Sequence, residues 1–149
     1  MSLENLLKIG QLKSHTPDAK EIHQLLQAAR RNINDARNEQ ISHETRFDAA
    51  YKAIMQAALV ALMASGFRPD TNRPGHHATV VQSLVKTIEL KATRVTVLDT
   101  LRRKRNLSDY TGADLDHASV QICITEAEKL LNDIEGWLKK HRPELTHVK

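Results

Sequence analysis

Apolar residues recur every three or four positions along most of the chain, and no stretch keeps the two-residue alternation of a β-strand. This spacing predicts long helices. The first should begin at Thr16, which precedes Pro17 and can cap the helix, and should extend to about Asn38. The second should begin after Ser42 and end at Gly66.

Helical spacing continues through the second half of the chain. It resumes over residues 76–90, after a polar loop bounded by prolines, and continues over about 92–109. The last helix should be capped by Asp114 or Asp116 and should end at Pro143. The connections between these helices are short, which favours antiparallel neighbours.

The predicted fold class is therefore all-α, an antiparallel four-helix up-down bundle with one or two additional short helices. One short helix is expected over about 3–13, the bundle core over about 16–142, and a frayed tail over 143–149. A chain of 149 residues suits one domain with a single core. We therefore expect residues 1–149 to form a single domain.

Composition favours a soluble cytoplasmic protein. The single cysteine, Cys123, lies in the apolar stretch VQICIT, so it cannot form an intramolecular disulfide and is expected to be buried. The N-terminus lacks the basic region and long apolar run of a signal peptide. The stretch AIMQAALVALMASG is interrupted by Gln56 and falls short of the roughly 18 apolar residues that a membrane span needs. We expect no membrane association.

The charge is mildly basic and is concentrated in one place. The net charge is +4, and the densest cluster is RRKR at residues 102–105. Aromatic residues make up only 3% of the chain, which argues against binding of single strands by base stacking. Sequence motifs for a phosphate loop, a zinc site or a serine hydrolase are missing, and adjacent His76 and His77 would point about 100° apart on a helix. We predict no metal and no cofactor.

The end of the helix over 92–109 places polar residues where its apolar face should continue. Arg105 follows Leu98 by seven residues and so lies nearly beneath it on a helix. With Arg102 and Asn106 it makes one polar patch, and Asp109 is spaced to pair with it. A helix-end ion pair explains this pattern without any functional role, with the basic residues complementing the helix dipole. The alternative is that Arg105 faces a polar cleft.

From Phe47 to Tyr110 the sequence resembles the HEPN superfamily, named for a nucleotide-binding domain of higher eukaryotes and prokaryotes. The resemblance lies in the helix DAAYKAIMQAALVALMASG, in GHH at residues 75–77 and in the Arg-Asn pair with a tyrosine at residues 105–110. It implies a four- or five-helix bundle, commonly dimeric, with the arginine motif of each protomer facing a shared cleft. Many such proteins resemble metal-independent ribonucleases in which a histidine follows the arginine by four to six residues.

Transferred to this chain, the resemblance makes Arg105 the motif arginine and Asn106 the polar residue after it, while Tyr110 replaces the histidine. An unperturbed tyrosine, with a pKa near 10, is only about one part in a thousand ionised at pH 7. The candidate catalytic residues are Arg105, Asn106 and Tyr110. The candidates for binding nucleic acid or phosphate are Arg102, Arg103 and Lys104. The candidate cleft residues are Asp48, Tyr51, His76, His77 and Asp109.

Three functional hypotheses follow. The first is a catalytically weak or inactive module that binds RNA or a protein partner, and the resemblance implies a toxin–antitoxin pair with a nucleotidyltransferase-like antitoxin. The second is a metal-independent ribonuclease toxin that uses Arg105 and Tyr110. The third is a purely structural homodimer formed through the apolar helix over 43–65. The first ranks highest because acid–base chemistry of the missing histidine is difficult to replace, and a homodimer is expected in any case.

Overall fold

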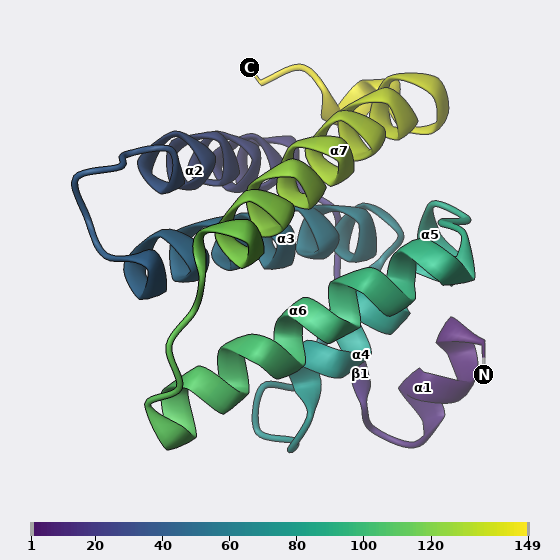
Figure 1. Ribbon diagram of the computed structural model, residues 1–149. Helices are drawn as coiled ribbons and strands as arrows, with labels where there is room; N and C mark the ends of the chain where they lie inside the picture. Colours follow the sequence, from purple (N-terminus) through teal and green to yellow (C-terminus); the bar gives the residue numbers. More distant parts are fainter. Residues whose placement is uncertain (1, 149) are drawn as a thin grey trace.

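The computed structural model describes residues 2–148, and helix predominates in it (Figure 1). The helices are α1 (Leu3–Lys8), α2 (Ala19–Ala36), α3 (His43–Ala64), α4 (His76–Gln82), α5 (Leu84–Thr87), α6 (Ala92–Thr111), α7 (His117–His141) and the 3₁₀ helix η1 (Pro143–Leu145). Two short strands, β1 (Leu12–Ser14) and β2 (Phe67–Pro69), complete the fold. The predicted helical class is confirmed in its coarse form, as a bundle-like arrangement with one small sheet.

Helix α3 forms the centre of the molecule. It contacts α2 and α7 as well as α4, α5 and α6, and Figure 1 shows α2 and α6 on opposite sides of it. By length and composition alone α3 could cross a membrane, but 72% of that apolar window is buried inside the fold. Its hydrophobicity is therefore that of a core helix, which packs on several faces.

Side-chain caps begin three of the four longest helices, α2, α3 and α7, whereas α6 begins without one. Ser42 caps α3 as predicted, because its hydroxyl accepts from the backbone N–H of Thr45 at 3.2 Å. Helix α2 begins later than predicted: the carboxylate of Asp18, and not the hydroxyl of Thr16, accepts from a first-turn N–H. Asp116 caps α7, which confirms one of the two predicted positions. An aspartate one residue beyond the Thr-Pro signal was enough to move the start of α2.

The sheet contradicts the expectation that the chain contains no strand. β1 pairs with β2 in antiparallel register, with Leu12 opposite Pro69 and Lys13 opposite Arg68. The helix predicted over 3–13 ends at Lys8, since Gly10 takes a left-handed φ of +80° that a helix cannot continue. Each strand has three residues, too few to show alternation in the sequence.

Residues 76–90 also differ from the single helical segment that their spacing predicts. They form two short helices, α4 and α5, separated at Ser83, whose hydroxyl donates to the carbonyl of Val80 at 2.6 Å. Glu89 then has a positive φ of 56°, which ends helical structure before α6 begins. The short helices place α4 against both α3 and α6.

The C-terminal segment is less frayed than predicted. Within the described part of 143–149, η1 packs against α2 and α7, and Leu145 is buried. Cys123 is buried in α7, as expected, and burial raises the pKa of its thiol. The packing of η1 extends the core beyond the end of α7.

Candidate functional site

Arg105 lies on the inner face of α6, where it meets α3. Leu98 and Leu101, on the same face, are buried in the core. The Nε atom of Arg105 lies 3.4 Å from Oδ1 of Asp48 on α3 and 3.5 Å from Oδ2 of Asp109 on α6. The predicted helix-end ion pair with Asp109 is therefore present, and Asp48 adds a contact between helices. Two carboxylates surround one arginine.

The ring of Tyr51 supports the same guanidinium. The central carbon of the Arg105 guanidinium lies 5.1 Å from the centroid of that ring, within the range of a cation–π contact. The Nε atom is buried and has no hydrogen-bond partner among the described residues. The side chain as a whole is 30% exposed. Arg105 is thus held in place by charge and by stacking, with part of the side chain at the surface.

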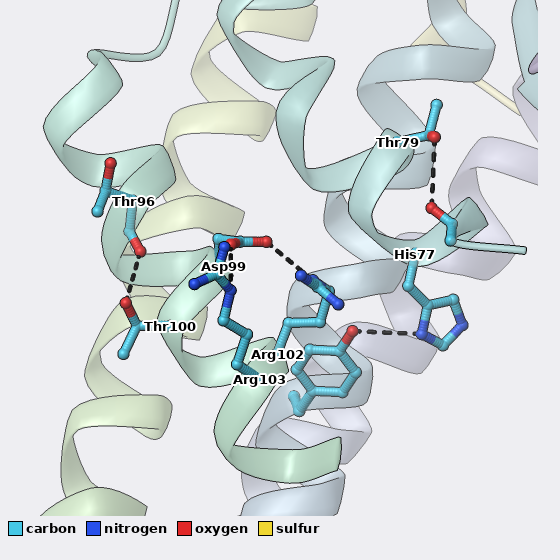
Figure 2. A network of polar contacts seen from close by, with 9 residues as sticks. His77, Thr79, Thr96, Asp99, Thr100, Arg102 and Arg103 are labelled. Atoms are coloured by element: carbon cyan, nitrogen blue, oxygen red, sulfur yellow. Dashed lines mark hydrogen bonds and ion pairs between the residues drawn. The ribbon is translucent and has the colours of Figure 1, made fainter. Parts of the chain in front are cut away.

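Tyr51 connects this arginine to a histidine. Its Oη lies 3.3 Å from Nδ1 of His77 at the start of α4, the contact drawn to His77 in Figure 2. Burial raises the pKa of Tyr51 to about 12, although the charges of Arg105 and Arg102 oppose the change. Burial, followed by the charges of His76, Arg105 and Arg102, lowers the pKa of His77.

At neutral pH the tyrosine therefore keeps its proton and the imidazole is neutral. The Tyr51 hydroxyl then donates to Nδ1 of His77 when the ring carries its proton on Nε2. The result is a short chain of contacts from Arg105 through Tyr51 to His77, made by α6, α3 and α4.

The other basic residues of α6 are also paired. Figure 2 shows Asp99 in contact with both Arg102 and Arg103. Its carboxylate oxygens lie 2.8 Å from Nε of Arg102 and 3.0 Å from Nε of Arg103. Asp99 and Arg102 are mostly buried, at 14% and 17% side-chain exposure, while Arg103 is largely exposed. Lys104 donates to the hydroxyl of Ser119 on α7 at 2.7 Å. Asp99 was not among the predicted site residues, although its spacing of three and four residues to the arginines is a recognisable signal.

The other two predicted catalytic residues are Tyr110 and Asn106, which follows Arg105 directly in the chain. Tyr110 is 88% exposed and Leu107 is 56% exposed, so this part of α6 turns two large side chains to solvent. Asn106 is half-buried. Within residues 2–148, the side chains of Asn106 and Tyr110 make no hydrogen bond to protein. The tyrosine beside the arginine is Tyr51, predicted as a cleft residue, and not Tyr110.

The two adjacent histidines stay close despite their different directions on α4. The ring centroids of His76 and His77 are 4.6 Å apart, and both side chains border a pocket of about 320 Å³. In the part of the chain that the structure describes, no three His, Cys, Asp or Glu side chains form a group that could hold a metal ion.

These features define a mostly helical, bundle-like protein with an arginine-centred polar cluster between α3, α4 and α6. The predicted cleft residues Asp48, Tyr51, His77 and Asp109 all belong to this cluster. No protein-family model and no curated protein matches the chain. The HEPN assignment stays a prediction that rests on the resemblance of residues 47–110 to that superfamily.

Proposed function

We propose that this chain is a HEPN-like binding module, a four-helix up-down bundle with short extra helices, that has weak or no catalytic activity. It acts in the cytoplasm as a homodimer and binds RNA or a nucleotidyltransferase-like antitoxin in that form. The surface through which two copies of the chain form the dimer is the outer face of the C-terminal half of α6. We call this the outer α6 surface, formed by Arg103, Asn106, Leu107 and Tyr110.

The spacing of these four residues makes them neighbours on one face of α6, at positions i, i+3, i+4 and i+7. The observation that carries the proposal is the exposure of Leu107 and Tyr110 on that face. Tyrosine, arginine and large apolar side chains are enriched where protein surfaces bind each other, and tyrosine and arginine often dominate the binding energy. The face is thus suited to a protein contact.

The charges near this surface favour protein over RNA as the first partner. Asp48, Asp99 and Asp109 lie within ion-pair distance of the three arginines at residues 102–105. RNA affinity depends on cations that can neutralise phosphates. Because much of the local positive charge is already balanced, an RNA contact would rest mainly on Lys104, whose partner Ser119 is neutral, and on the exposed Arg103, which shares the single carboxylate of Asp99 with Arg102.

Weak catalysis is proposed because no histidine contacts Arg105 directly among the described residues. Tyr110, at the position of the motif histidine, points to solvent. Tyr51 contacts the arginine, but it is buried and its raised pKa keeps the hydroxyl protonated, which makes it a poor general base near neutral pH.

Sedimentation velocity tests the proposed dimer surface. The wild type should sediment as a dimer, and Leu107→Asp should weaken the dimer by at least about tenfold, because it places a charge in an apolar contact. Val97→Asp is the matched control, since Val97 is an exposed apolar residue of the same helix that lies outside the outer α6 surface, almost three turns before Leu107. A monomeric wild type, or equal effects of the two substitutions, would reject the outer α6 surface.

A ribonuclease is the second candidate, and the contact between Tyr51 and His77 favours it. Burial lowers the pKa of His77 and so keeps a neutral imidazole one side chain away from Arg105. A neutral imidazole can accept a proton from a ribose hydroxyl. This candidate requires RNA cleavage that persists in EDTA and depends on Arg105 and on either His77 or Tyr110.

A further inference from the structure

A pocket of about 320 Å³ lies between the two-stranded sheet, α3 and the start of α4. We call it the sheet pocket. Its volume is in the lower range of cavities that hold small molecules. It shares His77 with the arginine cluster, but its other lining residues lie elsewhere.

One wall of the sheet pocket carries two cations side by side. Lys13 of β1 and Arg68 of β2 are directly opposite in the antiparallel register, so their side chains project from the same face of the sheet. Like charges at opposite positions repel each other. Neither side chain forms an ion pair with a carboxylate of residues 2–148. Two unneutralised cations at one pocket wall favour an anion.

The opposite wall adds further polar donors. His76 and His77 line the pocket from α4. A neutral imidazole still carries one N–H donor. The one carboxylate in the lining is Asp70, and its Oδ1 accepts from the backbone N–H of Asn72 at 3.0 Å within the loop. The lining therefore has an excess of positive charge and of donors.

The apolar part of the lining is firmly placed. Met55, Leu59 and Val80 line the pocket, and Met55 and Val80 are buried in the fold. The loop at its rim is tied to the N-terminal segment, since Arg73 donates to the carbonyl of Ile9 at 3.2 Å and Asp70 donates through its N–H to Gln11. These contacts indicate a pocket that is formed before a ligand arrives.

We propose that the sheet pocket binds a small amphipathic anion, a carboxylate or phosphate monoester with a short apolar chain. The anionic group of the ligand contacts Lys13 and Arg68, and its apolar tail lies against Met55, Leu59 and Val80. Charge-assisted hydrogen bonds to the two cations orient the head group. Burial of the ligand's apolar tail removes apolar surface from water. This site goes beyond the proposed function and does not depend on it.

Calorimetric titration of the full chain tests the proposal with four probes. Octyl phosphate and octanoate carry both features, 1-octanol lacks the charge, and inorganic phosphate lacks the chain. At least one amphipathic anion should bind with a Kd below about 1 mM and about tenfold more tightly than either partial probe. Tighter binding of octyl phosphate would identify a phosphate head group, and tighter binding of octanoate would identify a carboxylate. Equally tight binding of 1-octanol, or of inorganic phosphate, would overturn the proposal.

The double variant Lys13→Gln/Arg68→Gln should weaken binding of the better probe by about tenfold or more. Lys20→Gln/Arg31→Gln removes the same charge from exposed positions on α2 and should leave binding unchanged. Equal affinities of the two variants would overturn the site. If the first variant fails to fold, Arg68→Gln alone takes its place. The amide NMR shifts that the better probe causes in the wild type then give a second test. Shifts that avoid residues 13, 68, 76 and 77 would reject the pocket. Neither readout depends on dimer formation.

Discussion

The guanidinium carbon of Arg105 lies 5.1 Å from the ring centroid of Tyr51, so beyond Leu101 the contact between α6 and α3 is made by a stacked arginine. This contact explains why an arginine can continue the apolar face of α6. The ring covers the guanidinium, and Asp48 and Asp109 balance its charge. Several measurable consequences follow from this arrangement.

Substitutions of Tyr51 should separate the stacking role of the ring from the hydrogen bond of the hydroxyl. Tyr51→Phe keeps the ring over Arg105 and should lower the free energy of unfolding by about 1 kcal/mol, because only the bond to His77 is lost. Tyr51→Ala also removes a buried ring and should cost about 3–5 kcal/mol. Urea unfolding measures both changes. Equal losses in the two variants would show that the ring contributes nothing.

The lowered pKa of His77 should make stability depend on pH. Since the folded-state pKa is below the ordinary value of 6.5, the unfolded chain binds a proton more readily than the folded chain. The contribution of His77 is therefore fully present above pH 6.5 and is lost as pH falls from 6.5 through the folded-state pKa. The free energy of unfolding of His77→Gln should vary less over that range than that of the wild type.

The control for this pH dependence is His23→Gln, since His23 is exposed on α2. Its pH profile of stability should match that of the wild type. A wild-type profile that is unchanged by His77→Gln would contradict the buried, neutral state of this imidazole.

Asp99 should be important for stability because it contacts both Arg102 and Arg103 in a mostly buried position. Asp99→Asn leaves Arg102 without its carboxylate and should lower the free energy of unfolding by about 2 kcal/mol. Asp133→Asn breaks the more exposed pair with Arg94 and should cost less than about 1 kcal/mol. Similar losses from the two substitutions, measured by chemical unfolding, would contradict this ranking.

Asp99→Asn should also strengthen RNA binding, although it lowers the free energy of unfolding. Loss of the Asp99 charge frees Arg102 and Arg103 to neutralise phosphates, so Asp99→Asn should bind a labelled single-stranded RNA more tightly at low salt. The difference should shrink as salt rises. Fluorescence anisotropy at several salt concentrations measures both effects. Unchanged affinity would show that these arginines do not contact RNA.

Local signals in the sequence predicted the helices well. Ser42 caps the helix that it was expected to cap, and Asp116 is one of the two caps expected for the last helix, because a side-chain oxygen before an apolar periodic segment satisfies first-turn N–H groups. The pairing of β1 with β2 was not predictable in the same way. It joins residues 12–14 to 67–69, and neither strand is long enough to show a pattern of its own.

The candidate site was predictable only in part, for the same reason. The pair of Arg105 and Asp109 lies within one helix, four residues apart, and was expected. The contacts of Arg105 with Asp48 and Tyr51 depend on how α6 packs against α3, which the spacing along one helix cannot specify. The exposure of Tyr110 is also a matter of packing, since it lies beyond the last turn of α6 that meets the core.

Cleavage of labelled RNA tests most directly the claim that this module binds and does not efficiently cut. Purified wild type, Arg105→Ala and Tyr110→Phe would be compared in EDTA, which removes contaminating metal-dependent nucleases. The account predicts no cleavage above background by any of the three proteins over a broad set of RNA substrates. Cleavage by the wild type that disappears in Arg105→Ala, with the variant still folded, would contradict it and identify a metal-independent ribonuclease.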